Sequence, residues 1–327
     1  MDLRKRLAAG AAAVWMAAAP GWVGAQTYPS RPITMVIPFA AGGPTDALGR
    51  VVAQSMGTIL NQRVIVENVT GGGGTLARQK TAQAQPDGYT VILAGLGTAT
   101  SVTLYRKLTF NPLESFDTVG LAAKVPMVLV GRKDLPAKNI AELVRYINGN
   151  QDKVTYGDGG LGSGSQFCGL LLMTSLNAKM TTVSYRGSGP AMLDLLGGRV
   201  DLLCDQTTTT LPQISNGTIK AYAVTTKTRV PTAPELPTLN ESGLRDFELS
   251  NWYGLMLRKG TPKATVDRLA AALRASIADP LVVKRLSEFG AIPASQELAT
   301  PEAFGTFFRA EVDKWAPIIK AAGVYAD

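Results

Sequence analysis

The sequence predicts an α/β protein of two lobes, in which two doubly wound sheets are joined by two hinge strands. Three observations support this prediction. Short, continuous apolar segments alternate with segments of helical spacing, which is typical of a parallel sheet covered on both faces. The alternation occurs in two successive series along the chain. A stretch with three prolines separates the second series from an almost entirely helical C-terminal part.

The first series is expected to form the first sheet. Residues 33–38 are apolar or β-branched, and apolar side chains recur at helical spacing in residues 45–60. We expect strands at 33–38, 63–67 and 89–94, and helices at 45–60 and 74–84.

The second series is expected to form the second sheet. Its clearest boundaries belong to a helix at 191–196, because Pro190 precedes it and Gly197 and Gly198 follow it. The other expected elements are strands at 125–130, 154–156, 180–185, 200–204 and 221–224, and helices at 139–148 and 165–176.

The proline-containing stretch 230–239 is predicted to be an extended connection. A strand at 251–257 and helices at 263–278, 280–289 and 301–322 should follow. Helices without intervening strands must pack on an existing sheet, so we assign them to the first lobe. The predicted domains are a signal peptide at 1–25, a discontinuous domain 1 at 26–126 and 249–327, and domain 2 at 127–248. Ligands of open parallel sheets bind beyond the carboxyl ends of the strands, so we expect a binding cleft between the lobes.

Composition excludes several function classes. The chain has 327 residues, enough for about two domains, and no histidine. The absence of histidine excludes Ser-His-Asp and Cys-His nucleophiles, HExxH zinc sites and histidine-ligated haem. Two cysteines cannot make a four-thiolate metal site. We therefore expect neither a metal nor a cofactor.

The N-terminus is typical of a secretory signal peptide. Arg4, Lys5 and Arg6 precede an apolar run, and residues 23–25 fit a cleavage site after Ala25. The alternative, a membrane anchor, is disfavoured because the run is shorter than the ~20 residues of a span and Pro20 interrupts it. We expect a periplasmic protein. In that oxidising compartment the two cysteines, Cys168 and Cys204, would either form a disulfide or remain buried thiols.

The basic charge does not indicate a nucleic-acid partner. The formal net charge is +8, but beyond the N-terminal segment no run of three basic residues occurs. A mild positive field of this kind favours anionic small molecules.

The turn after the first strand is a candidate ligand-binding loop. Gly42 and Gly43 let the backbone approach a ligand closely, and the following helix start suits a carboxylate. Asp46 caps this helix and could position a water molecule. The alternative is a plain strand-to-helix turn. The candidate residues here are Phe39, Ala40, Gly42, Gly43, Thr45 and Asp46, with Thr98 at the end of the third strand.

The corresponding turn of the second series, residues 157–165, contains the pattern G-x-G-x-x-G. Nucleotide binding is disfavoured, because no Asp or Glu follows between Gly159 and Leu193 to bind a ribose. A second anion cradle is favoured, with Gly160, Ser163 and Ser165 as its residues. By contrast, the run Gly71–Gly74 lacks the lysine of a P-loop, which favours a structural turn.

Two further strand ends carry candidate polar groups. Tyr185, Asp205 and Gln206 are predicted to face the ligand, although Asp205 and Gln206 could instead cap the next helix. Arg186 could pair with a carboxylate, or it could simply be solvated.

In this order, the motifs resemble the Bug-type extracytoplasmic solute receptors of tripartite tricarboxylate transporters. The motifs that carry the resemblance are 28–33, 38–46, 67–74, 86–89, 185–191, 196–201 and 321–325. The resemblance implies a two-lobed periplasmic binding protein of type II-like fold that closes around an organic carboxylate. In that family, the loops at Phe39–Asp46 and Gly160–Ser165 hold carboxylate groups. Many members have histidine where this chain has Phe167 and Cys168, which suggests a less polar or aromatic ligand. Amino-acid-binding members use the aspartate equivalent to Asp205 for an ammonium group, so an amine-bearing ligand stays open.

We therefore expect a monomeric, non-enzymatic protein that delivers a small organic carboxylate to membrane permease subunits. One alternative is a secreted two-lobed enzyme, with Asp46, Asp158 or Asp205 as general base and Tyr185 or Lys124 as acid. Another is a periplasmic ligand sensor for a membrane kinase, which would use the same cleft.

Overall fold

The sheet of the first lobe forms around β1 (Ile33–Ile37), four of whose five residues are buried. The computed structural model describes residues 28–326. β1 lies between β2 (Val64–Asn68) and β3 (Thr90–Gly95) and is parallel to both. β9 (Ser250–Arg258) pairs with β3 antiparallel, and β4 (Phe116–Arg132) pairs with β9 antiparallel. β10 (Ile292–Pro293) adds a short antiparallel edge to β4.

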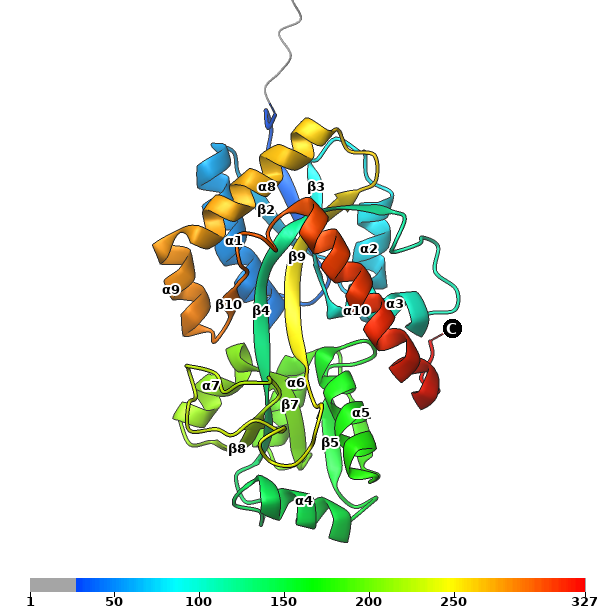
Figure 1. Cartoon of the computed structure of the whole chain (residues 1–327), viewed down its shortest axis with the longest axis vertical. Coiled ribbons are helices and arrows are strands. Elements are labelled where there is room, and N and C mark those ends of the chain that lie inside the picture. Colours follow the sequence, from blue (N-terminus) through cyan, green and yellow to red (C-terminus); the bar gives the residue numbers. More distant parts are fainter. Residues whose placement is uncertain (1–27, 327) are drawn as a thin grey trace, which may run out of the picture.

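The sheet of the second lobe continues from the other end of β4. β7 (Leu202–Gln206) and β8 (Ile219–Val224) both pair with β4 antiparallel. β5 (Thr155–Asp158) lies parallel to β7 and to β6 (Thr181–Ser184). We call β1–β3, β9, β10 and the first part of β4 the first lobe, and β5–β8 with the last part of β4 the second lobe. The two lobes are stacked along the long axis of the molecule (Figure 1).

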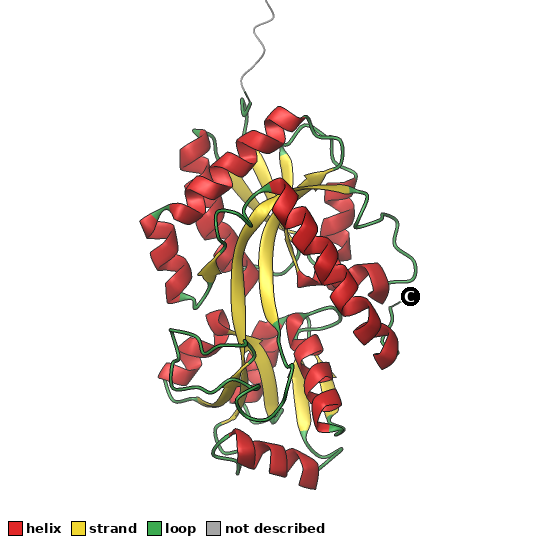
Figure 2. Cartoon of the chain, in the orientation of Figure 1, coloured by secondary structure: helices red, strands yellow, loops and turns green. Residues whose placement is uncertain are grey.

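The two-lobed α/β class is as predicted, but both sheets are mixed where parallel sheets were expected. In the first lobe, the chain leaves along β4 and returns along β9, so these neighbours must run in opposite directions. β4 is also much longer than the predicted strand at 125–130, with 17 residues. It pairs with β9 as far as Pro126 and with β7 from Met127 onward. β4 and β9 are the long strands that cross from one lobe to the other in Figure 2. The predicted domain boundaries at 126/127 and 248/249 remain a proposal.

Helices cover both lobes. In the first lobe they are α1 (Pro44–Leu60), the 3-10 turn η2 (Gly72–Gly74), α2 (Thr75–Ala82), α3 (Leu96–Leu104), α8 (Lys263–Ala278), α9 (Pro280–Glu288) and α10 (Pro301–Ala322). In the second lobe they are α4 (Ile140–Gly149), α5 (Gly164–Leu176), α6 (Ser188–Leu196) and α7 (Thr207–Ser215). Residues 230–239 contain no helix, but they form mainly turns and bends, with one bridge residue at Thr238, where an extended connection was predicted.

Sequence patterns did not predict α3 or α7, because both helices are rich in threonine, a poor helix former. Their hydroxyls bond to the helix's own carbonyls instead of disrupting it. Thr100 Oγ1 donates to Leu96 O at 3.2 Å, and Thr210 Oγ1 donates to Gln206 O at 3.1 Å. α3 packs on α10, β3 and β9, and α7 packs on β4, β7 and β8; these tertiary contacts outweigh the weak intrinsic propensity of the two helices.

The C-terminal helix α10 packs on both lobes. It lies along β4 and α3 of the first lobe, and its Trp315 and Ile319 belong to the same apolar cluster as Phe167 of α5. The ring centroids of Trp315 and Phe167 are 4.9 Å apart. The lobes therefore share an apolar contact on the α10 side of the molecule.

No helix within residues 28–326 has the length and apolar character needed to cross a membrane. The predicted signal peptide, residues 1–25, lies outside the described residues.

Candidate functional site

A cavity of about 250 Å³ lies between the two lobes. This volume is below the roughly 300–1,000 Å³ of pockets for drug-sized ligands, so it suits a small metabolite. Both predicted loops line it: residues 38–45 from the first lobe and residues 159 and 162–165 from the second.

Five helices begin in the wall of this cavity. Each helix N-terminus carries about half a positive charge and unsatisfied N–H groups, which favour a bound anion. The wall includes the first residues or N-caps of these helices: Gly43 and Pro44 (α1), Gly95 and Leu96 (α3), Ser163 and Gly164 (α5), Gly187 and Ser188 (α6), and Gln206 (α7).

Asp46 holds the first loop but does not line the cavity. One carboxylate oxygen accepts hydrogen bonds from Gly42 N and Arg50 Nε, each at 2.9 Å, and the other accepts from Asn68 Nδ2 at 3.0 Å. Burial alone would raise the pKa of this carboxyl, but the bonds from Arg50, Gly42 and Asn68 lower it below its usual value. Asn68 also donates to Phe39 O at 2.9 Å. With both oxygens engaged inside the loop, Asp46 positions the loop backbone and is not free to bind a ligand.

The second loop is fixed by a network of hydroxyls. Ser163 caps α5 by accepting from Gln166 N at 3.1 Å, and its Oγ lies 3.0 Å from Ser165 Oγ. Ser165 Oγ accepts from Gly159 N at 2.7 Å. Both serines line the cavity. Gly162, also in the wall, donates its N–H to Gln166 Oε1 at 2.8 Å.

Gly160 and Tyr185 do not belong to the cavity wall, contrary to their selection as candidate residues. Gly160 N donates at 2.6 Å to Asp158, a buried carboxylate beneath the loop. The phenol of Tyr185 donates to Asp194 Oδ2 of α6 at 2.6 Å. Both residues are therefore occupied in supporting the loops of the second lobe.

Asp205 and Gln206 end β7 and line the cavity. Asp205 is 1% exposed; its carboxylate accepts from Ser188 Oγ at 2.8 Å and from Thr209 Oγ1 at 2.5 Å. Burial raises the pKa of Asp205, although these hydrogen bonds act in the opposite direction. Within the described part of the chain, no basic side chain forms an ion pair with it.

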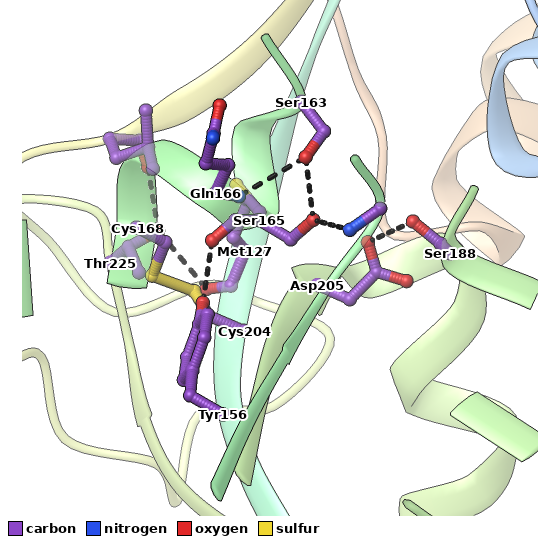
Figure 3. The surroundings of a disulfide bond; sticks show 12 residues. Met127, Tyr156, Ser163, Ser165, Gln166, Cys168, Ser188, Cys204, Asp205 and Thr225 are labelled. Atoms are coloured by element: carbon purple, nitrogen blue, oxygen red, sulfur yellow. Dashed lines mark hydrogen bonds between the residues drawn. A yellow bond between two sulfur atoms is a disulfide. The ribbon is translucent and has the colours of Figure 1, made fainter. Parts of the chain in front are cut away.

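Cys168 and Cys204 form a disulfide, which is one of the two states, disulfide or buried thiols, that the sequence left open. Both cysteines are fully buried, and the bond joins α5 to β7. Figure 3 shows Ser165 and Asp205 close to the bond, on the two elements that it joins. Tyr156 of β5, the neighbour of β7 in the sheet, donates to Ser165 O at 2.6 Å and so connects α5 to β5 as well. The disulfide thus fixes the two cavity-lining segments of the second lobe relative to each other.

Tyr253 of β9 connects the lobes through one hydroxyl and was not predicted. It donates to Gln206 Oε1 of the second lobe at 2.8 Å, and Thr45 Oγ1 of the first lobe lies 3.0 Å away. Because the phenol proton points to Gln206, the Thr45 hydroxyl must be the donor to Tyr253. Burial raises the pKa of Tyr253 to about 12, so the phenol is neutral at physiological pH.

Arg78 of α2 also lines the cavity and was not predicted. It is 2% exposed, and its Nη1 and Nη2 donate to Gly73 O at 3.4 and 2.8 Å. The sequence feature that could have indicated its role is the position of this arginine, one turn after Gly74 and in a helix without acidic residues. The glycine run itself was interpreted only as a structural turn.

The sequence between residues 48 and 324 matches the model of the tripartite tricarboxylate transporter family receptor. The chain belongs to this family. A curated relative from Agrobacterium vitis, named for the TAR-I ttuE-ttuC' intergenic region, is 48% identical over 91% of this chain and 86% of its own length.

Two solved structures support the family assignment. The structure of the periplasmic binding protein BugD is 45% identical, with a TM-score of 0.87 over 92% of this chain and 100% of that one. MatC from Rhodopseudomonas palustris with bound malate is 36% identical, with a TM-score of 0.84 over 89% of this chain and 100% of that one. The fold is thus the two-lobed, type II-like fold of periplasmic binding proteins. These neighbours are binding proteins, so the chain is a solute-binding receptor and not an enzyme.

The departure from the family at Phe167 lies away from the cavity between the lobes. Phe167 is buried against Trp315 and lies outside the cavity wall. The expectation that Phe167 and Cys168 signal a less polar ligand therefore has no basis in the wall of this receptor's cavity. Both residues serve the packing of the second lobe.

Proposed function

We propose that this receptor captures an organic carboxylate between its lobes by Venus-flytrap closure. The observation that carries the proposal is the convergence of five helix N-termini on one cavity between the lobes. Their dipole ends and free N–H groups stabilise negative charge, and the buried surroundings weaken screening by water. The residues that we propose to contact the ligand are Phe39, Ala40, Gly42, Gly43, Thr45, Thr98, Ser163, Ser165, Asp205 and Gln206, all of which line the cavity.

The receptor then delivers its ligand to the membrane permease subunits of a tripartite tricarboxylate transporter. Two observations support this part of the proposal: the family assignment, and the N-terminal segment that is typical of an exported protein. Malate in the related MatC is a small dicarboxylate, which is consistent with the size of this cavity. We propose that the receptor acts as a monomer.

Thermal unfolding of the purified protein tests ligand capture. Small organic acids should raise the melting temperature by mass action, and the corresponding amides, which lack charge, should not. Calorimetry on the acids that stabilise the protein would give their affinities, and mass spectrometry would show whether they are recovered unchanged. The proposal fails if no acid stabilises the protein, if amides bind as well as acids, or if a bound acid is chemically converted.

A further inference from the structure

Among residues 28–326, Arg78 is a buried cation without a counter-ion. Its guanidinium has five N–H donors, yet the acceptor recorded for it among the described residues is Gly73 O, and its Nε has no hydrogen-bond partner. No carboxylate of residues 28–326 forms an ion pair with it. Burial lowers its pKa to about 10, so it remains charged at neutral pH.

This arrangement is unfavourable for a purely structural residue. Burying a charge is costly unless the charge is paired and fully hydrogen-bonded. Arg132, by contrast, has a carboxylate partner in Asp201 at 2.7 Å. An incompletely satisfied guanidinium in a cavity wall instead fits a group whose partner arrives with the ligand.

Two glycines, which have no Cβ, allow this guanidinium to lie close to the backbone of the cavity wall. A Cβ added to Gly74 would lie 3.1 Å from Arg78 Nη1, and one added to Gly97 would lie 3.5 Å from Nη2. Gly97 also faces the second lobe, since its added Cβ would lie 3.2 Å from Gly162 O. Arg78 therefore sits where the first lobe meets the anion cradle of the second.

The charge of the whole wall exceeds what one carboxylate can balance. Its acidic and basic side chains are Arg78, the exposed Arg186 and the buried Asp205. To these the five helix N-termini add about half a positive charge each. A single carboxylate would leave most of this positive field uncompensated, whereas a dianion would neutralise it better.

We propose that Arg78 binds one carboxylate of the ligand and makes the cavity selective for dicarboxylates over monocarboxylates. The second carboxylate then lies against the helix N-termini. This inference rests on the proposed function, because it names the substrate class of the same cavity. Arg78 is thus a specificity-determining residue that would contact the ligand directly.

Matched acid pairs test the inference. L-malate and 3-hydroxybutyrate differ by the replacement of one carboxylate with a methyl group. Succinate and butyrate form a second pair that differs in the same way, with the same number of carbon atoms in the chain. Calorimetry should show that the wild-type protein binds the dicarboxylate of at least one pair at least about 30-fold more tightly than its partner. In Arg78→Met, which keeps the apolar stem and removes the charge, this ratio should fall towards one.

Two further variants complete the design. Arg78→Lys keeps the charge and should retain part of the selectivity, although it lacks the planar fork that binds a carboxylate through two bonds. Arg268→Met removes one charge from an exposed position of α8 in the same lobe and should leave the ratio unchanged.

The melting temperature of the ligand-free protein gives an independent readout. Removal of an unpaired buried charge should leave it unchanged or raise it, so Arg78→Met should be at least as stable as wild type without ligand. The inference is overturned if Arg78→Met keeps the wild-type selectivity, if wild type does not distinguish the paired acids, or if the variant unfolds at lower temperature while binding dicarboxylates normally. Binding of carboxylates without these Arg78 effects refutes the inference alone, whereas the absence of any carboxylate binding to wild type refutes the proposed function.

Discussion

Removal of one hydroxyl from Tyr253 should weaken ligand binding, because that hydroxyl connects the lobes across the cavity. In Tyr253→Phe, the ring stays in the core, but the bonds to Gln206 Oε1 at 2.8 Å and to Thr45 Oγ1 at 3.0 Å are lost. Only the bond to Gln206 crosses from one lobe to the other, because Thr45 and Tyr253 both belong to the first lobe. A neutral hydrogen bond contributes about 0.5–1.5 kcal/mol, so its loss should raise the dissociation constant roughly 2- to 13-fold.

Calorimetry with an acid that stabilises the wild-type protein measures this change directly. Small-angle scattering should show a smaller ligand-induced decrease in the radius of gyration, because the closed arrangement loses stabilisation relative to the open one. The matched control is Tyr222→Phe, which removes a buried phenol bond to Ala137 O at 3.1 Å in the second lobe, outside the cavity wall. This control should lower the melting temperature without changing affinity. Equal affinities of wild type and Tyr253→Phe, within twofold, would refute the role of this hydroxyl in closure.

Three more changes should have measurable effects. Ser163→Ala removes the cap of α5 and the bond to Ser165, so the free energy of unfolding measured with denaturant should fall by about 1 kcal/mol. Calorimetry should show that the binding free energy weakens by roughly 1–3 kcal/mol. Unchanged affinity would remove Ser163 from the ligand contacts. Asp46→Asn should destabilise the protein at pH 7. Because the folded-state pKa of Asp46 is lowered, its contribution is present above the unfolded-state value near 4 and is lost as the pH falls, so the difference in melting temperature between variant and wild type should shrink towards pH 3; a constant difference would contradict this. Replacement of Cys168 and Cys204 by alanine opens a loop of sequence separation 36 and should lower the free energy of unfolding by about 3–4 kcal/mol in denaturant titrations, whereas an unchanged midpoint would show that the bond does not constrain the unfolded chain.

The parts of the site that follow from local patterns were predictable. Residue type alone indicates two helix N-termini: one follows Gly42 and Gly43 after an apolar strand, and the other begins at Ser163. Both turns line the same cavity. Their role in ligand binding stays a prediction until a ligand is measured.

The parts that depend on contacts between distant residues were not predictable. Asp46 has the residue type of a ligand-binding group. However, Asn68 of β2 donates a hydrogen bond to it, and in this arrangement Asp46 supports the loop. Tyr253 is one aromatic residue among the apolar residues of β9, and only the approach of Thr45 and Gln206 gives its hydroxyl a role. Arg78 differs in sequence from a solvated arginine only by its place one turn after Gly74, in a helix without acidic residues.

The amino-acid sequence by itself determined the two α/β series, the helical C-terminal part and the absence of histidine chemistry, because hydrophobic period, proline and glycine positions and residue inventory are local properties. Tertiary structure decided the antiparallel return of β9 along β4, the threonine-rich helices α3 and α7, and the burial of Arg78 without a carboxylate. The physical reason is that strand direction, burial and the pairing of a charge are set by groups that are remote in sequence. Their free energies override weak local preferences only once the lobes have packed together.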